Sequence, residues 1–216
     1  MFKDRKDAGS KLGDALMIFK HDHPLIVGIA RGGLETAFYV ARKLDTDMVP
    51  IISRKLGYPF NPEFAMGALS EDGSLYLSSM ASSHLSESQL HEMLERTKPE
   101  IERRVKLLRH GKPLPSMKGK TVIVVDDGIA TGATLFATVD CCKKLKPSTL
   151  IVAAPIGDLD TMDQLNGLVD KVIVLETPPN FHAVSQGYEF FQNLTDEEAL
   201  EFVRKHEKTK KNCIEN

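Results

Sequence analysis

The sequence has no long apolar run, few cysteines and little net charge. No segment approaches the roughly 20 apolar residues of a membrane-spanning helix, and the opening MFKDRKDAGS has no apolar signal core. The three cysteines show no CxxC or Cys/His metal spacing, so we expect reduced thiols. A net charge of −2 gives no electrostatic case for nucleic acid. These absences favour a cytoplasmic globular protein without membrane or nucleic-acid partners.

Internal repeats, low-complexity tracts and linkers are also absent, and 216 residues fit one large domain. Neither a Ser/His/Asp nor a Cys/His catalytic set is evident. Apolar strand patterns alternate with helical patterns, which predicts an α/β fold with a mostly parallel five-stranded sheet between two helical layers. We therefore expect a single domain over residues 1–216. The five predicted strands are 25–30, 48–53, 122–125, 149–154 and 171–175.

The stretch 122–134, VIVVDDGIATGAT, joins a buried strand to two carboxylates, a small-residue turn and a helix predicted over 135–146. Unpaired N–H groups at a helix N-terminus bind anions, and glycines let a phosphate approach the backbone. Thr131 and Thr134 add hydroxyl donors. Carboxylates beside such a turn indicate a ligand that also carries hydroxyls or Mg²⁺. Ribose 5-phosphate fits this description; an ordinary strand–turn–helix with aspartate capping is the alternative.

The same thirteen residues resemble the phosphoribosyl-pyrophosphate (PRPP) signature of the type I phosphoribosyltransferases. The resemblance implies that Asp126 and Asp127 hold the ribose 2′- and 3′-hydroxyls and that residues 128–134 surround the 5′-phosphate. It also implies Mg²⁺ as a cofactor that arrives with PRPP, with Asp126 and Asp127 as its direct or indirect ligands.

Two positions depart from the family pattern. Gly128 stands where many members have a bulky aliphatic residue. Ala130 stands where 6-oxopurine salvage enzymes have an aspartate proposed as their general acid/base. The second departure argues against hypoxanthine or guanine as the acceptor.

A second glycine-rich turn follows the apolar segment 25–30, where Arg31-Gly32-Gly33 opens a helical run to Leu44. An arginine in such a turn suits an oxygen-rich anion. In the phosphoribosyltransferases the loop after the first core strand binds pyrophosphate, and the resemblance of IARGG implies that role here. A tight turn with a surface arginine is the alternative.

Two more cations, Arg54 and Lys55, are expected at the carboxyl end of the strand predicted over 48–53. They suit the same polyanion, although a charged pair of this kind can also be a solvated face. The segment that follows is rich in Gly and Pro and resembles the long loop that closes over the active site in this family. We therefore predict a flexible loop over about 54–80.

A small hood is expected from residues 178–203 together with an amphipathic helix over 2–20. By resemblance, the aromatic residues Phe181 and Tyr188 would cover the acceptor. The alternative is that they pack the terminal helix onto the sheet. Between loop and hood, Ser86–His110 predicts a charged helix with a capping box, which Pro99 should kink or break.

The sequence thus predicts transfer of ribose 5-phosphate from PRPP to a nitrogenous acceptor, such as a nucleobase, with release of pyrophosphate. Catalysis would depend on fixing both ends and neutralising the departing charge, roles assigned to Asp126, Asp127, Arg31 and Lys55. The residues predicted to bind PRPP are Ala30, Arg31, Gly32, Arg54, Lys55, Asp126, Asp127, Gly128, Ile129, Ala130, Thr131, Gly132, Ala133 and Thr134.

Two other functions fit the sequence. One is a regulator that binds PRPP or a nucleotide without efficient turnover. The other is an unrelated α/β phosphatase with Asp126 as nucleophile. The oligomeric state is left open, with a homodimer as one option.

Overall fold

A computed structural model describes residues 1–58 and 61–214, and its centre is the predicted five-stranded sheet. The strand order is β2-β1-β6-β7-β8, and each neighbouring pair is parallel. This arrangement confirms the predicted fold class. The strands are β1 (Leu25–Ile29), β2 (Met48–Ile51), β6 (Thr121–Val125), β7 (Thr149–Ile156) and β8 (Lys171–Glu176).

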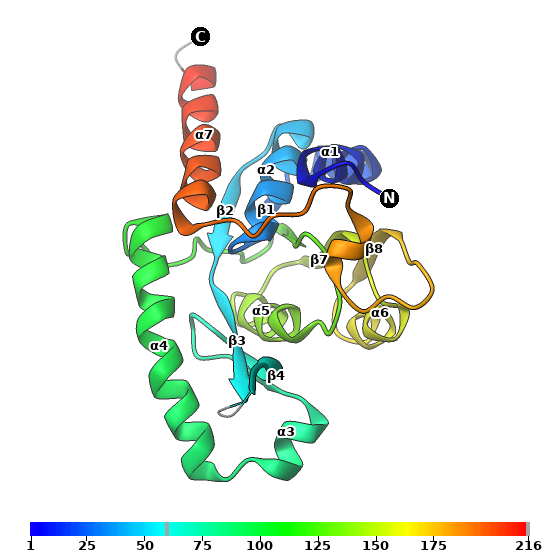
Figure 1. Ribbon diagram of the computed structural model, residues 1–216. Helices are drawn as coiled ribbons and strands as arrows, with labels where there is room; N and C mark the ends of the chain where they lie inside the picture. Colours follow the sequence, from blue (N-terminus) through cyan, green and yellow to red (C-terminus); the bar gives the residue numbers. More distant parts are fainter. Residues whose placement is uncertain (59–60, 215–216) are drawn as a thin grey trace.

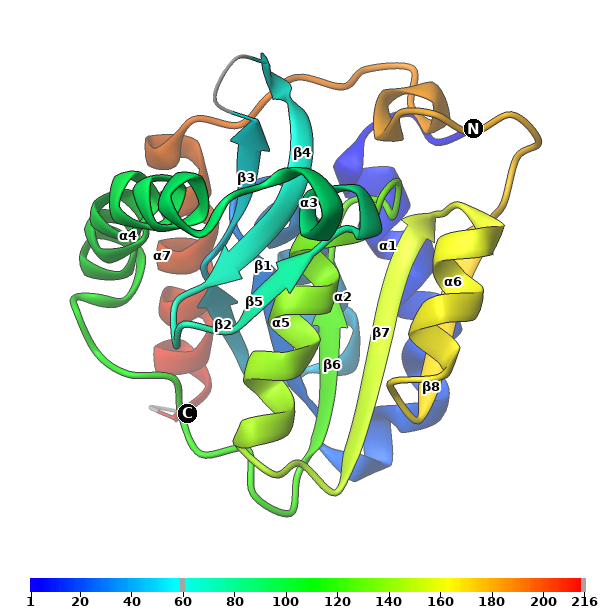
Figure 2. The ribbon, with the colours of Figure 1, turned by 90° about the horizontal axis from the view of Figure 1, so that it is seen from below.

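Helices cover both faces of this sheet, which explains why its strands are almost continuously apolar. Figure 2 shows α5 (Ala133–Lys144) and α6 (Leu159–Asn166) in front of the sheet, with α1 (Arg5–Ala15) and α2 (Gly32–Leu44) behind it. In β6, Val122 and Val124 pack on the α5 side, whereas Ile123 packs on the side of α1 and α2. The sheet is therefore the middle of three layers.

The first helix is shorter than the predicted 2–20. Asp4 is its N-cap and accepts a hydrogen bond from the Asp7 N–H, so the helix begins at Arg5. After Ala15 the chain tightens into a 3₁₀-helix, η1 (Leu16–Asp22). Leu12 and Leu16 pack together against the sheet on either side of this change.

Where a flexible loop was predicted over 54–80, the structure has a second, antiparallel sheet; residues 59 and 60 lie outside the described part. The Ile52 N–H donates to the Glu71 carboxylate at 2.9 Å, so the chain leaves the parallel sheet after β2. Arg54 and Lys55 consequently lie within a strand and do not follow one. The strands are β3 (Ser53–Tyr58), β4 (Asn61–Ser70) and β5 (Leu75–Leu77), in the order β3-β4-β5.

A long helix, α4 (Glu87–Arg109), follows the short α3 (Ser79–His84) and runs beside the second sheet (Figure 1). The Ser86–Gln89 capping box is present as predicted. The helix continues through Pro99 and is not broken there, because Met93 and Ile101 anchor both flanks in one apolar cluster with the second sheet. It ends at His110, which adopts a left-handed conformation.

The last helix, α7 (Asp196–Ile214), packs against both α2 and α4. Leu34, Leu108 and Leu200 form the centre of this contact. A short 3₁₀-helix, η2 (Val184–Gly187), lies in the connection between β8 and α7. None of the helices in 1–58 and 61–214 combines the length and apolar character needed to cross a bilayer.

A buried ion pair joins α4 to the second sheet. Arg109 donates to both Glu71 carboxylate oxygens and to the Pro50 carbonyl at 2.8 Å, and both charged side chains are under 10% exposed. Removing one partner leaves the other charge buried. We predict that Arg109→Met lowers the free energy of unfolding by about 3–5 kcal/mol.

The matched control is Arg96→Met on the same helix, where Arg96 pairs with Glu92 in solvent. Its expected cost is about 0–1 kcal/mol. Urea unfolding of both variants checks the prediction. Equal losses for Arg109→Met and Arg96→Met would contradict it.

Candidate active site

The carboxyl ends of β1 and β6 open into one cleft because these strands are parallel neighbours. Their register pairs Leu25 with Val122 and Gly28 with Val125, so both following turns start at the same height. The cleft has a volume of about 210 Å³ and is lined by residues of both turns, by Lys55 of β3 and by Val184 of η2. Every residue predicted to bind PRPP lines it, except Arg54 and Ile129.

Asp126 follows β6 directly and lines this cleft. Its Oδ1 accepts a hydrogen bond from the Asp127 N–H at 2.9 Å. Desolvation, followed by the neighbouring charge of Asp127, raises the pKa of Asp126 well above its ordinary value. A Cβ added at Gly33 would come within 2.8 Å of Asp126 Oδ1, so glycine allows α2 to approach the carboxyl group.

Asp127 is held by a residue that the sequence did not single out. Arg5, in the first turn of α1, donates through Nε to Asp127 Oδ2 at 2.7 Å, and the two side chains are 6% and 13% exposed. A Cβ at Gly32 would lie 2.0 Å from the same oxygen. Gly32 therefore leaves room for the ion pair. No local pattern reveals this contact, because its partners are 122 residues apart.

The turn between β6 and α5 is anchored by β7 and α6. The Ile129 N–H donates to the Ile156 carbonyl at 2.9 Å, and Thr161 Oγ1 donates to the Ala130 carbonyl at 2.8 Å. The Ile129 side chain is fully buried beneath the turn, which is why it does not line the cleft. Gly132, the N-cap of α5, has a φ of 65°, a left-handed conformation that favours glycine.

The turn after β1 places Arg31 at the cleft, and the peptide between Ala30 and Arg31 is cis. Arg31 Nη1 lies 3.7 Å from Asp196 Oδ1 at the start of α7. Arg104 of α4 reaches the same oxygen at 3.2 Å, and Arg103 pairs with the other. Asp196 thus connects the turn to α4 and α7, and it was not among the predicted site residues.

Arg54 and Lys55 point in different directions, because successive side chains of a strand alternate between its faces. Lys55 lines the cleft, as predicted. Arg54 instead pairs with Glu100 of α4 at 3.2 Å and does not line the cleft. The prediction that Arg54 lies in the site is therefore wrong for this structure.

Phe181 and Tyr188 do not line the cleft. Both are buried in a cluster with Phe2 and Ile156, and the Tyr188 hydroxyl donates to the Asp127 carbonyl at 2.5 Å. Burial raises the pKa of Tyr188. The alternative, that these aromatics pack against the terminal helix, is also wrong, since their partners lie at the N-terminal segment and on β7.

Val184 is the hood residue that does reach the cleft. A Cβ at Gly128 would come within 2.5 Å of Val184 Cγ1. The side chain of Val184 therefore occupies the space that a larger residue at position 128 would need. This contact gives a physical reason for the Gly128 departure noted in the sequence.

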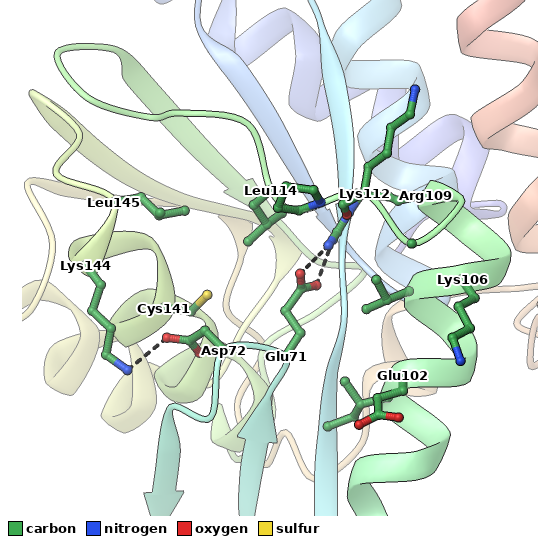
Figure 3. A pocket seen from close by; sticks show the side chains of 14 residues that line it. Glu71, Asp72, Glu102, Lys106, Arg109, Lys112, Leu114, Cys141, Lys144 and Leu145 are labelled. Atoms are coloured by element: carbon green, nitrogen blue, oxygen red, sulfur yellow. Dashed lines mark hydrogen bonds and ion pairs between the residues drawn. The ribbon is translucent and has the colours of Figure 1, made fainter.

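A larger cavity, of about 680 Å³, lies between α4, α5 and the β4–β5 turn (Figure 3). Two of its carboxylates, Glu71 and Asp72, are paired with Arg109 and Lys144 respectively, and Glu102, Lys106 and Lys112 also line it. Burial raises the pKa of the Cys141 thiol to about 12, so this side chain stays protonated at neutral pH. The smaller cleft holds the acidic pair and both predicted turns, and it is therefore the candidate active site.

The chain is thus a three-layer α/β protein with a candidate ligand site at the carboxyl edge of its parallel sheet. The family model for the phosphoribosyl transferase domain matches residues 6–187. The chain therefore belongs to the phosphoribosyltransferase family, and the resemblance to the type I enzymes is confirmed.

Two Mycobacterium tuberculosis proteins, from strains H37Rv and CDC 1551, each named "putative phosphoribosyl transferase", are 35% identical to the chain over 205 residues. The matched region is 94% of this chain and 46% of each relative, so the chain spans about half the length of the curated relatives it matches. The crystal structure of TT1426 from Thermus thermophilus is 33% identical, with a TM-score of 0.78. That match covers 95% of this chain and 98% of the other.

The raised pKa of Asp126 has a consequence for stability. Between its ordinary value of 3.8 and its native value, the folded chain keeps a proton that the unfolded chain has released. Stability therefore falls as the pH rises through this window. We predict that Asp126→Asn raises the free energy of unfolding at pH 7, and that this gain shrinks as the pH falls toward 3.8.

Urea unfolding from about pH 7 down to roughly pH 4.5, without added metal, measures this difference. The control is Asp140→Asn at an exposed position of α5, which should change stability by less than about 0.5 kcal/mol at each pH. A gain for Asp126→Asn that does not vary with pH would contradict the explanation.

Proposed function

We propose that this domain transfers ribose 5-phosphate from PRPP to a nitrogenous acceptor and releases pyrophosphate. The observation that carries the proposal is the convergence, in one cleft, of the acidic pair, the glycine-rich turn at the start of α5 and the arginine turn after β1. Together these groups offer contacts for sugar hydroxyls, a phosphomonoester and a second, more highly charged phosphate group.

The proposed roles follow the positions of the side chains. Asp126 and Asp127 bind the ribose hydroxyls, and the backbone from Gly128 to Thr134 binds the 5′-phosphate. Arg31 and Lys55 neutralise the charge that develops on the departing pyrophosphate. Catalysis then consists of holding the two ends of the breaking bond in place, so no protein nucleophile is needed. Arg54 supports the site indirectly through α4.

Mg²⁺ fits this proposal as an ion carried mainly by the oxygens of PRPP. Within residues 1–58 and 61–214, no group of three His, Cys, Asp or Glu residues is placed to hold a metal. Asp127 Oδ2 is also already bonded to Arg5. When bound, Mg²⁺ would supply positive charge to the pyrophosphate, and Asp126 and Asp127 would act on it directly or through the ligand.

For the acceptor, we propose a nucleobase other than a 6-oxopurine. Ala130 has no carboxyl group, its carbonyl is bonded to Thr161, and its methyl group packs beside the Phe181–Tyr188 cluster. Of the hood, Val184 lines the cleft and would contact the acceptor edge. We also propose that residues 1–216 act as one unit, with a hood built from residues 2–20 and 178–203.

The second candidate function is a PRPP-binding regulator without efficient turnover, which the missing carboxylate at Ala130 favours. A phosphatase with Asp126 as nucleophile is not supported. The chain belongs to the phosphoribosyltransferase family, and a phosphatase of this kind would not need the Thr131–Thr134 turn that lines the cleft.

Calorimetric titration with PRPP and Mg²⁺ tests the proposed site. Asp127→Asn should weaken PRPP binding on the order of 10- to 100-fold, because a charged hydrogen-bond acceptor is lost. Thr131→Ala should weaken it by roughly 3- to 10-fold, because a neutral donor is lost. Thr209→Ala on α7 is the control and should bind as wild type does. Absence of binding by folded wild type would reject the proposal.

A screen of nucleobases and other nitrogenous acceptors for pyrophosphate release separates the two candidate functions. A transferase releases pyrophosphate with at least one acceptor, and Asp127→Asn reduces that rate. Tight PRPP binding without release for any acceptor would instead support the regulator.

A further inference from the structure

We propose that Arg5 is a positioning residue for the sugar side of this site: it fixes the Asp127 carboxylate and compensates its charge while the ligand is bound. The inference rests on the proposed function, and it adds a residue from α1, outside both predicted binding turns. It starts from the position of Arg5, which is 5% exposed although it is an arginine in the first turn of a helix.

Three contacts hold the Arg5 guanidinium in a single orientation. Nε donates to Asp127 Oδ2 at 2.7 Å, and Nη1 donates to the Gln192 carbonyl at 2.7 Å. The guanidinium carbon lies 4.0 Å from the centre of the Phe191 ring, within the range of a cation–π contact. A planar fork with several donors suits this arrangement, whereas a lysine ammonium does not.

Asp127 is held by hydrogen bonds from two side chains, those of Arg5 and Tyr188. Its carboxylate is held by α1 through Arg5, and its backbone carbonyl accepts the Tyr188 hydroxyl at 2.5 Å. The Cα of Gly32 also packs against this carboxylate, since a Cβ at Gly32 would overlap Asp127 Oδ2. Oδ2 is therefore committed to the protein, and Oδ1 is the oxygen through which Asp127 can accept a sugar hydroxyl.

Charge gives Arg5 its second effect. PRPP is a polyanion, and an unpaired carboxylate in the cleft would repel it. The ion pair with Arg5 neutralises Asp127 and leaves Arg31 and Lys55 to attract the phosphates. The cleft can thus present an acceptor oxygen to the sugar without repelling the phosphates.

The test compares Arg5→Met and Arg5→Lys with wild type by calorimetric titration of PRPP with Mg²⁺, and of inorganic pyrophosphate with Mg²⁺. PRPP affinity should fall on the order of 10- to 100-fold for Arg5→Met and about tenfold for Arg5→Lys, which keeps the charge without the fork. Pyrophosphate has no sugar, so its affinity should change by less than about threefold. Arg42→Met, which removes an arginine stacked on Phe38 of α2, is the control and should leave both affinities unchanged.

A double-mutant cycle shows whether Arg5 acts through Asp127. In the Asp127→Asn background, Arg5→Met should weaken PRPP binding by less than about threefold, because the carboxylate that it positions is gone. Circular dichroism checks that each variant is folded. If Arg5→Met does not fold, the affinities of Arg5→Lys decide the test.

Three outcomes overturn the inference while leaving the proposed function standing. The first is that Arg5→Lys and every other folded Arg5 variant bind PRPP with wild-type affinity. The second is that an Arg5 variant loses affinity for PRPP and for pyrophosphate by the same factor. The third is that Arg5→Met weakens PRPP binding as much in the Asp127→Asn background as in the wild type. Absence of PRPP binding by wild type would instead reject the proposed function itself.

Discussion

The parallel pairing of β1 with β6 is the constraint on which the candidate site depends. Their register brings the turn at Ala30–Gly32 and the acidic pair to one edge of the sheet. Close packing then fixes the distance between the turns, because Gly32 and Gly33 place the start of α2 directly against the two carboxyl groups. These glycines are explained by the approach of two backbones to each other. A side chain at either position would push the turns apart and open the cleft.

Contacts from other elements fix the positions of the two turns, which follow β1 and β6. Ile129 and Thr161 fasten the turn before α5 to β7 and α6. Asp196, at the start of α7, reaches Arg31 in the other turn. Asp127 itself is held by Arg5 of α1 and by Tyr188, which follows η2. Elements from both ends of the chain therefore meet around the acidic pair. Such restraint suits a reaction whose barrier is lowered by positioning and charge.

The departures from expectation have local physical causes. Arg54 and Lys55 were expected to act together, but a strand sends adjacent side chains to opposite faces, and only a loop would have allowed both to reach the cleft. The aromatic residues Phe181 and Tyr188 were expected over an acceptor. They are buried because the N-terminal segment, with Phe2, offers them an apolar surface. Pro99 leaves α4 unbroken because apolar packing on both sides of it outweighs one lost hydrogen bond.

The sequence by itself determined the five strands of the parallel sheet and the two turns that line the cleft. These features are local: apolar strands, glycine turns and capping residues lie next to one another in the chain, and the thirteen residues 122–134 carry their own pattern. Tertiary structure alone decided the contacts of Arg5, Asp196 and Val184 with the site, and the folding of 61–77 into antiparallel strands. Those contacts join residues far apart in sequence. The local pattern around an arginine in a helix is the same whether its side chain faces solvent or a carboxylate 122 residues away, so the pattern does not predict the contact.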